Sequence, residues 1–410
     1  MTDSTQQDFD LIIVGGGLIG SSLALALAPC GLKILLIEKF APNHQQQPSF
    51  DERTVALTWS SRQIFNGIGV WQKISAEDAT AIKDIHVSHL GQPGVAHLDR
   101  KHIGTEALGY VVPARVIGKN LYECLNNYKN VTVACPEEAV SFVSTDGHVA
   151  LTLASDETTV TGSLLVVADG GRSKLLENLE LDPVETPYPQ TALLTIIDSD
   201  RPHKGRAYER FTVEGPLALL PYQKNRYAVV WTSLPENVPS RMALSDYEFC
   251  NALQETFGDR AGRFSNPTAR KSYPLKKSSL GKPNFNRGLV IGNAAHTVHP
   301  VAGQGFNLGL RSVAELAESI ASQFSAGDDI GSPEMIEGFV SNHQGRVSRV
   351  QQFTHNMISV FSSDDLALKI LRGKALSVVE SCPPIKKLLL QRTMGLAGAQ
   401  SRLARGLSLS

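Results

Sequence analysis

The sequence lacks an excess of charge of either sign, and this shortage excludes a class of partners. Its 39 lysine and arginine residues nearly balance 40 aspartate and glutamate residues, which leaves a formal net charge of -1. A chain with no global positive field has little to attract a polyanion. It also contains no basic stripe with interleaved aromatic residues of the kind that binds a strand. The sequence therefore predicts no nucleic-acid partner.

Cysteine is scarce as well. The cysteines are odd in number, widely spaced and without a CxxC pair: Cys30, Cys124, Cys135, Cys250 and Cys382. This pattern favours neither a zinc site nor a disulfide framework, and it fits a reducing cytoplasm. No HExxH motif occurs, and pairs such as His86 with His89 or His97 with His102 are more typical of surface or core residues than of metal ligands. We expect no metal.

Long uncharged runs are rare, and the most prominent one covers residues 11–32. Its length would allow a membrane span or a signal peptide. However, acidic residues precede it, four glycines interrupt it, and Pro29 and Gly31 end it as in a loop. We therefore expect neither. A chain of 410 residues with 42% hydrophobic and 19% charged residues is expected to fold into two or three domains with a large core.

What the sequence does contain is a nucleotide-binding fingerprint near its N-terminus. An apolar strand pattern over residues 10–14 runs into Gly15-x-Gly17-x-x-Gly20, and a helical pattern over residues 21–28 follows. Gly15 permits a tight turn, Gly17 lets the backbone approach a pyrophosphate, and Gly20 lets the helix pack on the strand. The unpaired N–H groups at the start of the helix would bind the anion.

A second strand pattern, residues 33–37, ends in Glu38, from which a carboxylate can bind ribose hydroxyls. An acid at this position favours an unphosphorylated ribose, as in FAD or NAD. We predict that the cofactor contacts at this end come from Gly15, Gly17, Leu18, Ile19, Gly20, Glu38 and Lys39.

Two later patterns also place ligand-binding residues at strand ends. Asp169 and Gly170 follow a strand pattern over residues 164–168, where ligands bind in open α/β sheets. The distal segment, residues 292–305, follows another short strand pattern and precedes an amphipathic helix predicted over residues 306–324. The start of that helix would direct free N–H groups and a positive dipole at a ligand. A reduced flavin fits, because its pyrimidine edge carries negative charge; a helix start closed by glycines for packing alone is the alternative.

The order of these patterns predicts an α/β fold with three parts. A discontinuous Rossmann-like FAD-binding domain would cover residues 1–80, 99–186 and 275–336. An inserted β-sheet substrate domain would cover residues 81–98 and 187–274, with a hairpin turn at residues 223–226. A helical C-terminal region would cover residues 337–410. Within the first domain we predict helices over residues 60–68 and 115–126.

Three motifs in this order resemble those of the FAD-dependent aromatic hydroxylases, the flavoprotein monooxygenases of the p-hydroxybenzoate hydroxylase type. The motifs are Gly15-x-Gly17-x-x-Gly20 with Glu38, then Ala168-Asp169-Gly170-x-x-Ser173, then the distal segment. The resemblance covers most of the chain, and residues 108–112, 215–221 and 302–311 are similar to the ubiquinone-biosynthesis branch of the family.

The resemblance implies roles for individual residues. Arg53 and Arg115 would contact the cofactor on the active-site side. The remaining contacts would come from Asp169, Gly170, Gly292, Asn293, Pro300, Gly303, Gln304, Gly305 and Asn307. Asn293 stands where many members of the family carry aspartate. An asparagine at this position is typical of the ubiquinone-biosynthesis branch. Ser312 and Leu176 stand where aspartate and arginine are common, so we assign them no contact.

The resemblance also implies a function. The chain would be an FAD monooxygenase that hydroxylates a polyprenylated methoxyphenol with O2, through a flavin C4a-hydroperoxide in a dry cavity. NAD(P)H would dock transiently, because only one dinucleotide fingerprint is present. The base is unidentified: His299 and Pro300 are the catalytic candidates, with His296 a further histidine nearby. Hydroxylation of another ring position or another aromatic, a flavin-bound scaffold of a quinone-biosynthesis assembly, and a flavin reductase stay open.

The C-terminal segment 384–396 is both basic and apolar. Such a segment can lie on a membrane surface, where a polyprenyl substrate resides. It can equally pack on the core or form a subunit contact in a homo-oligomer. We therefore expect a cytoplasmic protein and leave open whether it associates with the inner membrane.

Overall fold

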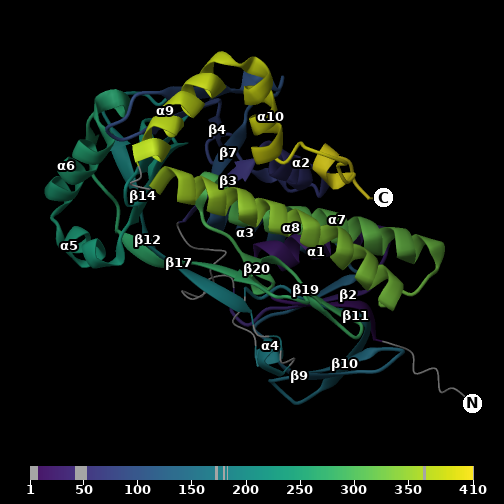
Figure 1. The fold of residues 1–410 in the computed structure, drawn as a ribbon. Helices are drawn as coiled ribbons and strands as arrows, with labels where there is room; N and C mark the ends of the chain where they lie inside the picture. The colour runs from purple at the N-terminus through teal and green to yellow at the C-terminus, as the bar shows by residue number, and fades with distance from the viewer. Residues whose placement is uncertain are drawn as a thin grey trace, which may run out of the picture.

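The structure is a computed structural model that describes residues 8–41, 53–170, 174–178, 181, 183–362 and 366–409. Its strands form three sheets, and two long helices, α7 and α8, run alongside one another across the molecule (Figure 1).

The first sheet has a parallel centre. Its strands follow the order β18 (Asn284–Phe285), β19 (Gly288–Val290), β11 (Thr159–Val167), β1 (Phe9–Val14), β2 (Ile34–Ile37) and β8 (Val131–Ala134). Only β18 runs antiparallel to its neighbour in this path. The apolar runs of β1, β2 and β11 are buried, as expected for parallel strands covered on both faces. The first half of β11 pairs instead with the hairpin β9 (Ala139–Ser144) and β10 (Val149–Leu153).

Helices cover one face of this sheet and form the main core. They are α1 (Leu18–Leu27), α2 (Trp59–Gly67), α3 (Ala114–Leu125), α7 (Gln304–Ala326) and α8 (Pro333–Ser362). The short helix α4 (Lys174–Asn178) and the β9–β10 hairpin lie on the other face. α2 and α3 confirm the predicted helices within one residue at each end. α7 begins two residues earlier and ends two residues later than predicted; Gly303 before it and Gly327 after it both adopt the left-handed conformation, which at Gly327 ends the helix.

The second sheet is mostly antiparallel. Its order is β20 (His296–Thr297), β17 (Lys271–Ser279), β12 (Val184–Ser199), β15 (Arg226–Ser233), β14 (Gly215–Tyr222), β13 (Arg206–Thr212), β5 (Asp84–His89) and β6 (Val95–Asp99), with β16 (Phe264–Ser265) on β12. The predicted hairpin between β14 and β15 is confirmed. The outer face of the second sheet packs on α5 (Val238–Ala243) and α6 (Asp246–Phe257). α10 (Pro383–Thr393) packs on its other side, next to α9 (Leu366–Ser381).

A third, small sheet joins the two large ones. It consists of β3 (Thr54–Thr58), β7 (Gly109–Pro113) and β4 (Thr80–Ile82). Single 3₁₀ turns occur at Ala28–Cys30, Trp71–Lys73, Arg100–His102, Pro235–Asn237, Asp259–Ala261, Gly292–Ala294, Val301–Gly303 and Leu403–Arg405. The domain boundaries stay a prediction, and β17 and β20 join part of the segment 275–336 to the second sheet.

Two observations concern the described residues alone. None of their helices combines the length and the apolarity that crossing a bilayer would require. None of their histidine, cysteine, aspartate and glutamate side chains gather in threes or more in a way that could hold a metal ion.

Candidate functional site

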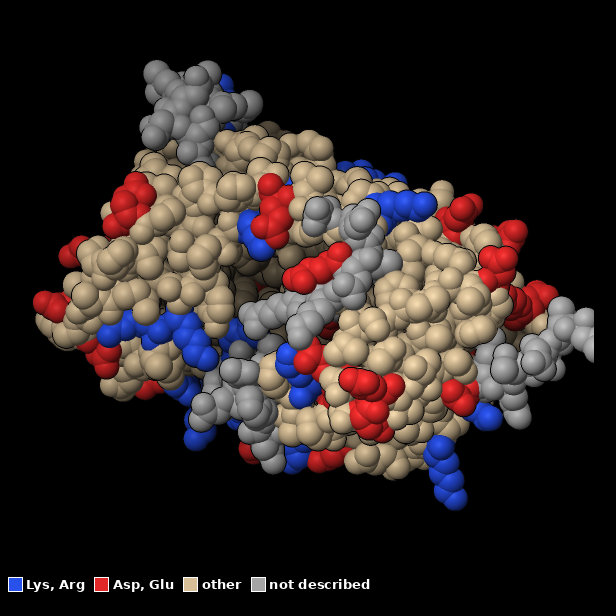
Figure 2. All heavy atoms as spheres, turned by 90° about the horizontal axis from the view of Figure 1, so that it is seen from below, with Lys and Arg blue, Asp and Glu red and all other residues tan. Residues whose placement is uncertain are grey.

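A cavity of about 1840 Å³ extends from the carboxyl ends of the first sheet to the inner face of the second. Figure 2 shows a hollow on one face of the molecule, with acidic and basic side chains near its edge. Residues that lie far apart in the sequence line this cavity together, including Gly15 and Gly17 from the first motif and Gly303 and Gly305 from the distal segment.

The turn between β1 and α1 forms one end of the cavity, and it has no room for side chains. A Cβ on Gly15, whose φ is +105°, would lie 2.6 Å from the Cα of Asp169. A Cβ on Gly16 would lie 2.7 Å from the Tyr122 hydroxyl, and one on Gly20 would overlap the Gly15 carbonyl oxygen. Gly20 does not line the cavity, so it acts through helix packing. Sequence reasoning missed Gly16, although the run of three glycines was a signal.

The start of α1 offers backbone donors to this end of the cavity. Its N-cap is Gly17, which has no side chain to satisfy the first N–H groups, and its first turn contains no acidic residue. Leu18 and Ile19 line the cavity here. These donors suit an anionic group such as a pyrophosphate.

Glu38 supplies a buried carboxylate beside this turn. It follows β2 directly, lines the cavity, and accepts a hydrogen bond from the Phe40 N–H at 2.9 Å. Burial and the nearby Glu38 charge raise the pKa of Tyr122, so this phenol stays protonated. Lys39 lines the cavity and pairs with Glu138 at 2.9 Å. Such a carboxylate fits a ribose, as the sequence predicts.

Cationic and acidic residues follow along the same cavity. Arg53, Arg115, Asp169 and Gly170 all line it. The Arg53 guanidinium lies 5.8 Å from the centre of the Tyr273 ring. Ser173, the last residue of the second motif, lies outside the described residues.

The distal segment packs directly on the first motif. A Cβ on Gly292 would lie 3.3 Å from the Ile19 side chain, and one on Gly309 would lie 3.0 Å from it. Gly292 and Asn293 line the cavity. Glycine at these positions therefore lets the turn after β19 (Gly292) and α7 (Gly309) both approach Ile19 of α1 closely.

The start of α7 faces the cavity. Gly303, Gly305 and Phe306 line it at the N-cap and the first turn, which holds no acidic residue. The positive end of the helix dipole is therefore directed at the cavity, where negative charge would be stabilised.

Two amides predicted to contact a cofactor do not line the cavity. Gln304 is 2% exposed, and its Nε2 donates to the Thr393 carbonyl at 3.1 Å. Asn307 is 0% exposed; it accepts from the Thr58 N–H and donates to the Ala56 carbonyl, both at 2.8 Å. Their positions on α7 direct the two amides to α10 and β3, and their contact with a cofactor stays a prediction.

The histidines of the distal segment also lie outside the cavity lining. Both ring nitrogens of His299 are engaged, by Gln190 and by the Val301 N–H, and burial lowers its pKa to about 4. Burial and the nearby His343 lower the pKa of His296 to about 3. Pro300, the other catalytic candidate, does line the cavity.

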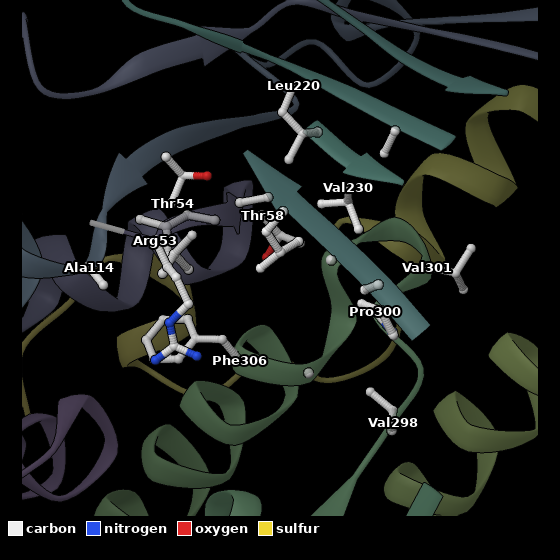
Figure 3. A pocket seen from close by; sticks show the side chains of 18 of the residues that line it. Arg53, Thr54, Thr58, Ala114, Leu220, Val230, Val298, Pro300, Val301 and Phe306 are labelled. Atoms are coloured by element: carbon white, nitrogen blue, oxygen red, sulfur yellow. The ribbon is translucent and has the colours of Figure 1, made fainter. Parts of the chain in front are cut away.

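The far half of the cavity is lined mostly by apolar side chains. Leu220 and Val230 from the second sheet lie around it with Pro300 and Val298 from the distal segment, and Arg53 and Phe306 line the cavity on the side away from Leu220 (Figure 3). Side chains of α8, α9 and α10 complete the lining with Phe353, Met357, Phe361, Leu376, Val379 and Leu389. Ser312 and Leu176, which the sequence assigns no contact, do not line it: Ser312 Oγ lies 3.2 Å from His343 Nε2, and Leu176 is in the core.

The residues present fit FAD at both ends. A cofactor of that length needs a dinucleotide turn with a ribose acid at one end and backbone donors for its reduced ring at the other. The β1–α1 turn with Glu38 and the start of α7 meet these needs within one cavity.

Similarities to known proteins agree with this geometry. The model of the FAD binding domain family matches residues 8–353. The chain is 32% identical to ubiquinone hydroxylase UbiL of Rhodospirillum rubrum, over 100% of this chain and 95% of that protein. It is 26% identical to 3-demethoxyubiquinol 3-hydroxylase of Escherichia coli, over 96% and 100%.

A solved structure shows the same fold. The p-nitrophenol 4-monooxygenase PnpA of Pseudomonas putida superimposes with a TM-score of 0.78 at 17% identity, over 95% of this chain and 98% of that one. This likeness confirms the predicted α/β class, with mixed sheets and C-terminal helices.

Proposed function

The chain belongs to the FAD binding domain family and is an FAD-dependent monooxygenase; from this premise we propose that it hydroxylates the aromatic ring of a ubiquinone precursor. One observation carries the proposal: the Gly15–Gly20 turn and the distal segment line one cavity whose other half is lined mostly by apolar side chains. Two relatives named for hydroxylating ubiquinone or a demethoxyubiquinol support the substrate class.

Within this class we take the substrate to be a polyprenylated methoxyphenol, as for 2-polyprenyl-6-methoxyphenol hydroxylase. The size and lining of the cavity support this choice. Its volume of about 1840 Å³ exceeds the roughly 300–1,000 Å³ of ordinary ligand pockets, so it has room for a cofactor and a second, apolar molecule. Ile85, Leu98, Leu376 and Leu389 offer such a molecule apolar contacts.

The chain's own residues would hold FAD and keep the reaction dry. We propose that Glu38 binds the ribose, Arg53 and Arg115 the active-site side, and the N–H groups of Gly303 and Gly305 the pyrimidine edge. Bound FAD would supply the electrons and the oxygen chemistry. The apolar sheet face would exclude water, which otherwise diverts reducing power into hydrogen peroxide. A nicotinamide reductant would dock transiently, which the single dinucleotide fingerprint supports.

We also propose a peripheral location at the inner membrane. α10 packs on the core through Leu390, and Lys386 pairs inward with Glu380 at 2.7 Å. Its outer side leaves Ile385 38% and Leu388 49% exposed. An apolar, lysine-flanked surface of this kind suits contact with a bilayer, from which a polyprenyl substrate would enter. A homo-oligomer or a complex of quinone-biosynthesis enzymes is the other use of this surface.

The experiment begins with the absorption spectrum of the purified protein and mass spectrometry of the released cofactor. We expect a flavin spectrum and the mass of FAD. The protein is then supplied with NADH or NADPH, a prenylated methoxyphenol and ¹⁸O₂. One labelled oxygen atom in the product, and accumulation of the unhydroxylated precursor in a deletion strain, are the expected results.

Other outcomes separate the alternatives. Turnover without label in the product would identify a reductase. Bound FAD without product under any reductant would favour a scaffold. Normal ubiquinone in the deletion strain would refute the pathway. The position of the new hydroxyl, read by NMR, identifies the ring site.

A further inference from the structure

A carboxyl group faces the cavity from the middle of the second sheet. Glu209 on β13 lines the cavity, and its paired neighbours are Val87 on β5 and Ala218 on β14. Residues paired across strands point to the same face of a sheet. Val87 and Ala218 also line the cavity, so the carboxyl is flanked by apolar side chains on both sides.

The same row of the sheet leads from Glu209 to the distal segment. Ala218 pairs with Val230 on β15, and Val230 lies around the cavity with Pro300 (Figure 3). Neighbouring strands are about 4.8 Å apart, so the backbones of Glu209 and Val230 are separated by roughly 10 Å. One substituted aromatic ring that rests on Val230 and Ala218 can therefore direct a ring hydroxyl at Glu209.

No protein group satisfies this carboxyl. In the described part of the chain nothing hydrogen-bonds or pairs with the Glu209 side chain, and burial alone raises its pKa to about 7. A carboxyl in an apolar setting without a protein partner is costly to keep ionised. The cost is offset when a bound molecule supplies the missing hydrogen bond.

The elements packed around Glu209 present apolar groups to it. Phe361 on α8 stacks on Phe211 with ring centres 4.0 Å apart, and Leu376 on α9 lines the same region. The adjacent Arg210 is turned away, since its Nε donates to the Thr256 carbonyl on α6.

The titratable groups nearby fall into two sets. His86 on β5 lies on the opposite face, where its ring packs against His97 and Tyr208. The titratable side chains of this half of the cavity are otherwise Tyr222, Arg226, Lys271 and Tyr273, since Tyr208 packs with His86 on the opposite face. None of them perturbs the carboxyl, whose shift has burial as its cause.

We propose that Glu209 is a catalytic residue: its carboxylate accepts a hydrogen bond from a ring hydroxyl of the substrate and takes up that proton. The inference rests on the proposed function. The O–H bond of the phenol breaks, its electron pair stays on the phenol oxygen, and a new O–H bond forms on a Glu209 carboxylate oxygen. The proton returns when the hydroxylated ring is protonated again. No electrons leave or enter, so the step needs no further reactant.

This transfer makes the ring reactive. The negative charge on the phenol oxygen spreads to the ring positions ortho and para to it, which are the positions that attack an electrophilic oxygen. A phenol has a pKa near 10, and a carboxyl with a pKa near 7 accepts its proton more readily than an exposed carboxyl does. A base matched in this way accelerates a reaction by about 10²–10⁴-fold.

The test compares Glu209→Gln and Glu209→Asp in the FAD-loaded full chain. Glu255→Gln, an acid-to-amide change on the exposed side of α6, is the matched control. The substrate is a 2-methoxyphenol carrying a short prenyl chain, and its methyl ether, which lacks the acidic proton, is the binding probe. Flavin content and absorption verify that each variant is folded and loaded.

We expect Glu209→Gln to lower kcat by about 100-fold or more and to abolish the rise of kcat/KM with pH near neutrality. Glu209→Asp should restore part of kcat. Binding of the methyl ether, read from the flavin spectrum, should be the same in all variants. Glu255→Gln should match the wild type. A Glu209→Gln enzyme with wild-type kcat and an unchanged pH profile would overturn the proposal.

A failure of the proposed function gives a different result. In that case the wild type does not hydroxylate the phenol at all. The binding comparison still tests Glu209, because the wild type should then bind the phenol more tightly than the methyl ether, and Glu209→Gln should erase that preference. If the wild type and Glu209→Gln prefer the phenol over the methyl ether to the same extent, the role of Glu209 is overturned independently of turnover.

Discussion

His299 Nε2 lies 3.1 Å from the Oε1 of Gln190, while Nδ1 of the same ring accepts the Val301 N–H at 3.2 Å. The second bond leaves the ring proton on Nε2, which donates it to Gln190. Gln190 lies at the irregular register of β12, and its Nε2 donates to the Glu214 carbonyl at 2.8 Å. One buried imidazole thus ties the distal segment to the second sheet.

Removing the His299–Gln190 hydrogen bond should uncouple oxygen consumption from hydroxylation without changing the pH dependence of the reaction. His299→Phe and Gln190→Leu would each let residues 298–301 shift against the sheet, and a displacement of about 1 Å can cost up to 100-fold in rate. We expect less product per O2 consumed and more hydrogen peroxide. Because burial holds the pKa of His299 near 4, the ring stays neutral above about pH 5 and contributes no change between pH 6 and 9.

The measurement is the ratio of product to oxygen consumed, with His148→Phe on the exposed β9–β10 hairpin as the control. A rise of kcat/KM with pH that disappears in His299→Phe would instead identify His299 as the base.

Asn307 should stabilise the protein whether or not FAD is bound. Its amide bridges the Thr58 N–H and the carbonyls of Ala56 and Gly303, so Asn307→Leu removes the hydrogen bonds of all three backbone groups to this side chain. We expect a loss of about 2–3 kcal/mol in the free energy of unfolding. Urea unfolding of the apoprotein and the holoprotein should show similar losses. A loss confined to the holoprotein would mean that Asn307 contacts the cofactor after all.

Alanine substitutions should distinguish a glycine that is required for close packing from glycines at exposed positions. Gly20→Ala would place a methyl group on the Gly15 carbonyl, so we expect poor FAD retention and a lower Tm. Gly281→Ala, at an exposed site with nothing within 4 Å, should leave both unchanged. Gly338→Ala, exposed within α8, should raise stability by about 0.5–1 kcal/mol. FAD content and thermal unfolding measure all three; normal FAD binding by Gly20→Ala would contradict the assigned contact.

Glu209 should make the stability of the wild type fall as pH rises. Its pKa is raised from 4.5 to about 7, so the folded state binds more protons than the unfolded state between these values. Unfolding free energy therefore decreases with pH through that window. Glu209→Gln removes this dependence on pH. The unfolding free energy of the variant, relative to that of the wild type, should therefore increase by on the order of 1–3 kcal/mol as the pH rises from 5 to 8. A pH-independent difference in urea unfolding would contradict the raised pKa.

Much of the local structure was predictable because it depends on neighbours in the chain. The glycines of the first motif, the apolar runs of the parallel strands and the apolar positions of α3 are recognisable from spacing alone. Thr58 accepts a hydrogen bond from the Ser61 N–H at 3.3 Å and begins α2 where a helix was expected. Steric limits on φ and the periods of helix and strand act within a few residues, so sequence reports them.

The orientation of site residues was decided by tertiary contacts. Gly305 lines the cavity while the adjacent Gln304 reaches α10, and this depends on how α7 rotates as it packs on α1 and β3. Glu209 is one acid among many in the sequence, and only the pairing of β13 with β5 and β14 makes it face the cavity.

By itself, the sequence determined the nucleotide turn, the strands that support it and the glycines that keep it narrow, since these follow from short-range sterics. Only the tertiary structure decided which polar groups face the cavity and which are hydrogen-bonded to other parts of the protein. The physical reason is that a buried hydrogen-bonding group must find a partner, and whether that partner is protein or ligand depends on elements brought together from distant parts of the chain.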